Sequence, residues 1–137
     1  MSAPEPGLVV THRRYVSYAE AHYAGNLVDG AYGLGLFGDV ATEMCVLTDG
    51  DEGLLASYAD VQFRAPVHGG DLVEARAELV AVGNRSRTLD LILLVVGRAD
   101  PEGPDSAAQM LEEPLVATTA RGVVIVPARR VDHDTPR

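Results

Sequence analysis

The sequence predicts an α+β fold in which an antiparallel five-stranded sheet curls around one long central helix. Only the segment from about Asn26 to Thr48 has the length and apolar content of a helix, whereas the later segments alternate like strands. Most connections between those strands are short, as between antiparallel neighbours. One helix cannot cover both faces of such a sheet, so we also expect a homodimer or a higher homo-oligomer built from dimers.

The composition is that of one compact domain. The chain has 137 residues, of which 47% are hydrophobic, and this suffices for a modest core. We expect a flexible leader over residues 1–7, the domain over residues 8–127 and a flexible tail over residues 128–137. No apolar run approaches the roughly 18 residues of a membrane span, and the start of the chain lacks the pattern of a signal peptide.

Charge and cysteine content exclude several functions. The net charge is -9, the opposite of the basic surface that nucleic acids require. Every basic side chain is arginine, which excludes a lysine Schiff base and the usual pyridoxal phosphate chemistry. Cys45 has no partner for an internal disulfide, so we expect a cytoplasmic protein, and no Cys/His spacing suggests a metal site.

The first half of the chain is predicted to form one strand and then the helix. β-branched and aromatic residues favour a strand over Leu8–Ala21, which the glycine-containing "AHYAGN" then breaks. Asn26 is the expected N-cap of the helix, with Asp29 at the third helical position as in a capping box. The turn residues "TDGDEG" end the helix after about Thr48.

The second half is predicted to form four strands. The first of them, "LASYADVQF", is expected to place Ala59, Val61 and Phe63 on one side. A turn, "RAPVHGGD", leads to a strand over residues 72–82, and "GNRSR" turns the chain again. Two further strands are expected at residues 88–96 and 114–126, joined by a long polar connection over residues 99–113.

The predicted helix is unusual in its glycine content. Gly33, Gly35 and Gly38 each cost about 0.5–1 kcal/mol relative to alanine within a helix. A sheet that curls around a helix requires the two backbones to approach closely, and a residue without a side chain permits that approach. We therefore expect these glycines to be structural.

Two acids of the helix are the first candidates for chemistry. Asp39 and Glu43 are four residues apart, so they lie one turn apart on the same face, among apolar neighbours. Such a pair can place a proton acceptor beside a proton donor. The alternative is a solvated polar stripe at a subunit edge.

The start of the helix is the second candidate site. Its first backbone N–H groups are unpaired and lie at the positive end of the dipole, so those of Gly30 and Ala31 can polarise a carbonyl oxygen. His22 and Asn26 precede them; His22 is either an acid or base of the site or the cap of a strand end. Met44 and Cys45 are expected in the core, and His12, His68 and His133 on the surface without a role.

Arginines in a turn provide a third candidate. The "GNRSR" turn carries Arg85, Ser86 and Arg87, whose guanidinium groups and amides are suited to phosphate. The alternative is that the two arginines are simply solvated.

Several segments of the chain resemble those of a known protein family. The order of elements resembles the hotdog fold, and Val61–Arg87 is similar to the strand-turn-strand of acyl-CoA hotdog proteins. "HYAGNLVDGAYGLGLFGDVATE", His22–Glu43, resembles the 3-aminobutyryl-CoA ammonia-lyases more specifically. Further matches are "DGDEGL", "APV" and "LEEP", so the resemblance runs from about Tyr18 to Pro127.

The resemblance implies a reversible carbon–nitrogen lyase reaction, from 3-aminobutyryl-CoA to crotonyl-CoA and ammonia, without a cofactor other than the CoA of the substrate. It implies that one acid of the helix pair takes the α-proton, that the other holds and protonates the amine, and that Asn26 or His22 positions the thioester. The sequence leaves open which acid has which role, and we assign Glu43 as the base and Asp39 to the amine. Arg85, Ser86 and Arg87 would face the CoA phosphates.

Two other functions remain open at the level of the sequence. A hotdog acyl-CoA thioesterase would use Asn26 and Asp39 to position a water molecule. A non-catalytic acyl-CoA binding subunit is less favoured, because apolar binding has no use for two carboxylates. A hotdog hydratase is disfavoured because its D-x-N-P-x-H pattern is missing from the chain.

Overall fold

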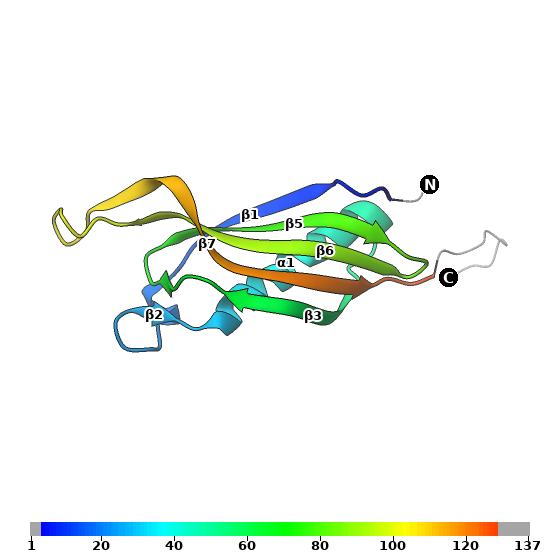
Figure 1. The fold of residues 1–137 in the computed structure, drawn as a ribbon, viewed down its shortest axis with the longest axis horizontal. Helices are drawn as coiled ribbons and strands as arrows, with labels where there is room; N and C mark the ends of the chain where they lie inside the picture. The colour runs from blue at the N-terminus through cyan, green and yellow to red at the C-terminus, as the bar shows by residue number, and fades with distance from the viewer. Residues whose placement is uncertain (1–3, 129–137) are drawn as a thin grey trace.

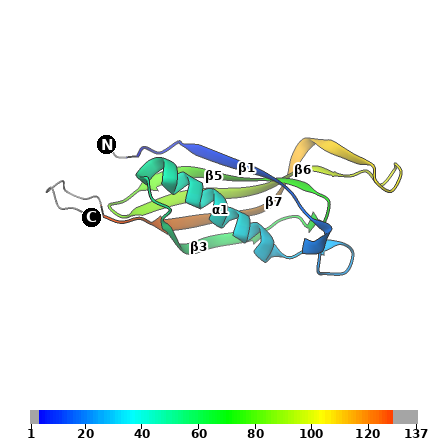
Figure 2. The ribbon, with the colours of Figure 1, turned by 180° about the vertical axis from the view of Figure 1, so that it is seen from behind.

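The main sheet has five antiparallel strands in the order β1-β5-β6-β7-β3, and the helix α1, Gly30–Asp49, lies across one of its faces (Figures 1 and 2). This structure, a computed structural model, describes residues 4–128. It confirms the α+β fold with one central helix. The strands of the main sheet are β1 Val9–Tyr15, β3 Leu54–Phe63, β5 Leu72–Val82, β6 Ser86–Ala99 and β7 Ala108–Ile125.

A second, two-stranded sheet lies at the start of the helix, and sequence reasoning missed it. It pairs β2, Leu27–Val28, with β4, Val67–His68. Each strand has only two residues, too few for an alternating pattern to be visible in the sequence. This pairing holds the segment before the helix against the segment that connects β3 to β5.

The N-cap of the helix is Asp29, so the prediction that Asn26 is its N-cap is wrong. The Asp29 carboxylate accepts a hydrogen bond from the backbone N–H of Tyr32 at 3.0 Å. Asn26 instead adopts φ 61° and lies directly before β2. Because β2 pairs with β4, the N-cap lies three residues later than predicted. The helix ends as expected, with Gly50 at φ 63° donating its N–H to the carbonyl of Val46.

One face of α1 forms the centre of the core. Phe37, Val40, Met44 and Cys45 are fully buried against the sheet, which confirms Met44 and Cys45 as core residues. The opposite face of the helix is not covered by any described part of the chain, and Val46 and Leu47 are more than half exposed there. Figure 2 shows α1 lying open on the sheet.

The helical glycines divide into two groups. An alanine Cβ at Gly33 would lie 2.9 Å from Leu93 Cδ2, so at this position the close approach to the sheet does require glycine. Gly35 and Gly38 have no atoms within 4 Å of the corresponding position. The prediction that these two permit contact with the sheet is therefore wrong, because both face away from it.

The first two strands depart from the predicted pattern. β1 ends at Tyr15 rather than Ala21, because Ser17 caps a short 3-10 helix, Tyr18–Glu20. In β3, register shifts relative to β7 and a φ of 52° at Asp60 interrupt the alternation. Phe63 is consequently 59% exposed, whereas Val61, which the sequence pattern placed on the same side, is half-buried.

Nearly half of the predicted polar connection over residues 99–113 is strand. β6 and β7 stay paired to Ala99 and Ala108, so that only residues 100–107 form the turn. This hairpin projects beyond the rest of the sheet (Figure 1). Its two faces are both largely exposed, so the sequence lacks the alternation by which a half-buried strand is recognised.

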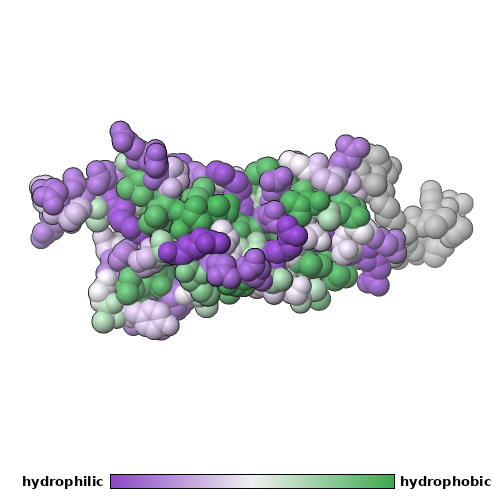
Figure 3. All heavy atoms as spheres, in the orientation of Figure 1, coloured by the Kyte–Doolittle hydropathy of each residue, from purple (hydrophilic) through white to green (hydrophobic). Residues whose placement is uncertain are grey.

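The outer face of the sheet carries charged and apolar side chains side by side (Figure 3). Ion pairs cross between neighbouring strands, from Arg13 to Glu74 at 2.6 Å and from Arg121 to Asp90 at 2.7 Å. Part of the predicted leader is also attached to the sheet, since the N–H of Gly7 donates to the carbonyl of Leu79. Nearly all of the predicted tail, from residue 129 on, lies outside the described residues.

Among residues 4–128, α1 is the longest helix, and it is not apolar enough over its length to cross a membrane.

Candidate functional site

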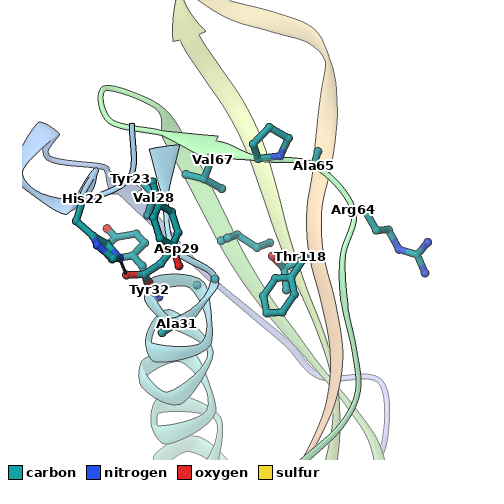
Figure 4. A pocket seen from close by; sticks show the side chains of 15 residues that line it. His22, Tyr23, Val28, Asp29, Ala31, Tyr32, Arg64, Ala65, Val67 and Thr118 are labelled. Atoms are coloured by element: carbon teal, nitrogen blue, oxygen red, sulfur yellow. Dashed lines mark hydrogen bonds and ion pairs between the residues drawn. The ribbon is translucent and has the colours of Figure 1, made fainter. Parts of the chain in front are cut away.

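A cavity of about 580 Å³ opens at the N-terminal end of α1 (Figure 4). Three of the predicted site residues, His22, Gly30 and Ala31, line it. The walls come from the segment before the helix, the first turn of α1, the end of β3 and the loop that follows β3. The other lining residues are Tyr23, Val28, Asp29, Tyr32, Gly33, Phe63, Arg64, Ala65, Pro66, Val67, Leu93 and Thr118.

Asp29 connects the helix start to His22. One carboxylate oxygen caps the helix through the N–H of Tyr32, and the other lies 2.7 Å from Nε2 of His22. The His22 ring also stacks on Tyr23, with 4.3 Å between ring centroids. Sequence reasoning assigned Asp29 only a capping role. Its contact with His22, seven residues earlier across a turn, corresponds to no characteristic sequence pattern.

The first turn of α1 supplies hydrogen-bond donors to this cavity. The N–H groups of Gly30 and Ala31 have no intrahelical acceptor, because they precede the first helical hydrogen bonds. The ring of Phe63 packs directly against Gly30, and a side chain at this position would require the ring to move. The cavity thus combines apolar walls with donors at the positive end of a helix, which suits a carbonyl oxygen that gains negative charge.

Arg64 lies at the rim of the cavity and extends away from the helix (Figure 4). Its Nε donates a long hydrogen bond, 3.4 Å, to the hydroxyl of Thr119. No carboxylate among the described residues forms an ion pair with it. Sequence reasoning missed Arg64, since a lone arginine at a strand end resembles any solvated residue.

The two helical acids lie outside this cavity. Asp39 and Glu43 are exposed on the outer face of α1, two to four turns beyond its start. At 1.5 Å per residue, they lie about 9 and 15 Å along the axis from Gly33, the last helical residue of the cavity. Within one chain, the structure therefore does not bring the acids to the helix start.

The neighbours of the two acids differ. Burial raises the pKa of the Tyr58 phenol, and the negative charge of nearby Asp39 raises it further. Glu43 contacts His12 of β1, with 2.7 Å between Oε1 and Nε2. The expectation that His12 lies on the surface is wrong, because its side chain is only 17% exposed and is paired with Glu43.

His68 does not line the cavity. His68 belongs to β4, and its Nδ1 is buried without a hydrogen-bond partner, so it is not the surface residue that was expected. His133 lies outside the described residues. No three His, Cys, Asp or Glu side chains of the described chain are grouped as metal ligands would be.

Asn26 has a structural contact. Its side-chain amide donates to the carbonyl of Gly69 at 2.9 Å, and its own carbonyl accepts from the N–H of Gly69 at 3.2 Å. These bonds hold the segment before the helix against the loop between β4 and β5. Asn26 does not line the cavity.

Arg87 does not fit its expected place at the CoA phosphates. The guanidinium is 2% exposed and binds both carboxylate oxygens of Asp49, at 2.9 and 2.7 Å. It also donates to the carbonyls of Gly83 and Ser86, so four of its five N–H groups are occupied. Its role is to join the end of α1 to the start of β6.

The rest of this turn is accessible but distant from the cavity. Arg85 is exposed and donates to the carbonyl of Val126, and Ser86 is half-buried. The turn lies at the opposite end of α1 from the cavity, since Arg87 pairs with the last residue of the helix. A helix of 20 residues spans about 30 Å.

Comparisons with known proteins agree with the fold and with the segments singled out in the sequence. The thioesterase superfamily matches residues 30–94. A 3-aminobutyryl-CoA ammonia lyase of Acetoanaerobium sticklandii is 46% identical over 114 residues, which cover 82% of this chain and 89% of that protein. The β-alanyl-CoA:ammonia lyase of Clostridium propionicum is 36% identical, with a TM-score of 0.83 over 89% of this chain and 87% of that one.

A more distant structure shows the same fold. A hexameric hotdog-fold thioesterase of Campylobacter jejuni superposes with a TM-score of 0.69 at 18% identity, covering 92% of this chain and 85% of that one. These findings confirm the resemblance inferred from His22–Glu43 and the hotdog fold. The chain belongs to the family of the 3-aminobutyryl-CoA ammonia lyases, which are carbon–nitrogen lyases of the hotdog fold.

Proposed function

We propose that the chain catalyses the reversible elimination of ammonia from 3-aminobutyryl-CoA to give crotonyl-CoA. The observation that carries this proposal is the 46% identity to a lyase of that name over most of both chains. The structure supports the proposal with a cavity that has helix-start donors at one end of α1, and with a pair of carboxylates on the exposed face of the same helix.

The proposed chemistry uses the acidity of the thioester. A thioester makes the proton on its α-carbon more acidic, and the N–H groups of Gly30 and Ala31 stabilise the enolate-like oxygen as the proton leaves. Glu43 takes the α-proton, the β-carbon–nitrogen bond breaks, and Asp39 holds the departing amine and supplies its proton. In the reverse direction, Asp39 binds ammonium. No prosthetic group takes part.

The separation of cavity and acids bears on the oligomer. A base and an oxyanion donor must each lie within about 3 Å of adjacent atoms of one substrate. Along one helix, Asp39 and Glu43 are about 12 and 18 Å from the nearer donor, Ala31. We therefore place the acids of one protomer at the helix start of a second copy, in a homodimer or a higher homo-oligomer built from dimers. The uncovered outer face of α1, which carries Asp39 and Glu43, is available for this contact.

The CoA moiety requires cationic groups for its phosphates. We propose Arg64, at the rim of the cavity, and Arg85 with Ser86, brought near by a neighbouring copy. Both arginines are exposed and lack a carboxylate partner among the described residues. His22 and Asn26 are proposed to hold the start of the helix in position for the thioester, through Asp29 and Gly69 respectively.

The test is a set of reactions with crotonyl-CoA, with and without ammonium, read by mass spectrometry and by a thiol reagent. The proposal predicts an ammonium-dependent product of the mass of 3-aminobutyryl-CoA and little free thiol. Rapid thiol release without amine formation would instead identify an acyl-CoA thioesterase. Binding without either reaction would identify a non-catalytic acyl-CoA binding subunit.

A further inference from the structure

We propose that His12 is the positioning residue for the Glu43 carboxylate, an inference that rests on the proposed function. His12 belongs to β1, at the edge of the sheet, and its Nε2 lies 2.7 Å from Oε1 of Glu43. The imidazole is mostly buried, with 17% of its side chain exposed, whereas Glu43 is 50% exposed. The pair thus joins a fixed group of the sheet to an otherwise mobile carboxylate of the helix.

Arg14 determines which nitrogen of His12 carries the proton. Its Nη2 lies 3.5 Å from Nδ1 of His12, and a guanidinium can only donate. Nδ1 is therefore the acceptor, and Nε2 carries the hydrogen and donates it to Glu43. The result is a chain of donors from Arg14 through the imidazole to the carboxylate, with Arg14 on β1 and Glu43 on α1 as the charged groups that contact the ring.

This chain defines the orientation of the proposed base. The bond to His12 holds Oε1, so Oε2 is the oxygen that remains free to take the α-proton. A long, half-exposed glutamate otherwise populates several rotamers, and ordering it costs free energy at each encounter with substrate. His12 is thus expected to affect turnover rather than substrate affinity, because it never contacts the substrate.

Two variants of His12 separate donation from packing. His12→Leu removes the donor, and kcat is expected to fall by about 10- to 100-fold, the effect of one hydrogen bond to a charged group, while KM stays within about twofold. His12→Gln places an amide N–H near the position of Nε2 and should restore kcat to within about threefold of the wild type. Arg13→Gln, which breaks an exposed ion pair on the same strand, is the matched control and should leave kcat unchanged.

A double variant tests whether His12 acts through Glu43. If it does, adding His12→Leu to Glu43→Gln lowers kcat no further than Glu43→Gln alone. Additive losses, or equal losses for His12→Leu and His12→Gln, would overturn the inference, because both would indicate a role in packing.

Nitrogen-15 NMR of the imidazoles keeps this inference distinct from the proposed function. We expect hydrogen on Nε2 of His12, and an Nε2–H resonance that shifts upfield in Glu43→Gln, since an amide oxygen is the weaker acceptor. Hydrogen on Nδ1 alone would overturn the positioning role even in an active enzyme. A wild type that adds no ammonia, with the expected resonances present, would overturn the proposed function and leave the structural pair established.

Discussion

Asp39 and Glu43 are the residues on which the proposed reaction depends. We expect Asp39→Asn and Glu43→Gln each to lower kcat by at least about 100-fold, the scale of a general acid or base, since an amide neither takes nor supplies the proton. Steady-state rates of ammonia addition to crotonyl-CoA measure this. Thr42 lies on the same outer face and bonds only its own helix, to Gly38, so Thr42→Ala is the control and should remain within a few-fold of wild type. Near-normal rates for both amides would remove the acids from the mechanism.

Cys45 provides a prediction on pH. Burial, followed by the charge of Asp49, raises the pKa of the thiol from 9.0 to about 11. Between these values the unfolded chain loses the thiol proton and the folded chain keeps it. The stabilising contribution is therefore complete below pH 9 and is lost as the pH rises towards 11.

This prediction is measured by urea unfolding at pH 8 and at pH 10.5. Between these two pH values the wild type should lose more free energy of unfolding than Cys45→Val. Tyr32 and Tyr58, whose pKa values are also raised, are present in both proteins and contribute equally to the two losses. Equal losses in the two proteins would show that the thiol does not contribute.

At the scale of elements, the ion pair of Arg87 with Asp49 joins α1 to β6. Arg87→Leu takes from the buried Asp49 carboxylate the guanidinium that binds both of its oxygens, so this change is expected to lower the free energy of unfolding by about 3–5 kcal/mol. Arg85→Leu, two residues away but exposed, should change it by less than about 0.5 kcal/mol. Denaturant unfolding compares the two. If Arg87→Leu kept full stability but bound CoA more weakly, Arg87 would have to be assigned to CoA binding and not to the structural ion pair.

The glycines of α1 provide a second prediction at this scale. Gly33→Ala forces Leu93 to move in a packed core and should destabilise the protein by about 1–3 kcal/mol. Gly38→Ala meets no atom of its own chain and should stabilise the helix by about 0.5–1 kcal/mol. Unfolding curves of the two variants distinguish them, and a loss at Gly38 would indicate that a second copy packs closely there.

At the scale of the whole molecule, the proposed site is shared between two copies. Glu43→Gln removes the base, and Ala31→Pro removes a helix-start N–H at a position where a first-turn proline is tolerated. Each variant alone should be inactive. After the two are refolded together, half of randomly formed dimers are mixed and one of their two sites is intact, so about a quarter of wild-type activity should return. No recovery on mixing would place the whole site within one chain.

Several features of this protein were determined by the sequence alone. The apolar segment that became α1, the limits of β5 at Leu72–Val82 and the acid pair all depend on neighbours within one or two turns or along one strand. The similarity of His22–Glu43 to the ammonia-lyases was also readable without coordinates. Such local patterns are set by interactions between residues close in the chain, so they are visible before folding is known.

Tertiary structure decided the contacts that complete the site. Asn26 bonds Gly69, Arg87 bonds Asp49 and His12 bonds Glu43, across 43, 38 and 31 positions of the chain. No periodicity connects such residues, because their meeting depends on how the sheet curls and where its strands are in register. For the same reason the sequence identified the kinds of side chain available for chemistry, and only packing determined which of them are free to meet a substrate.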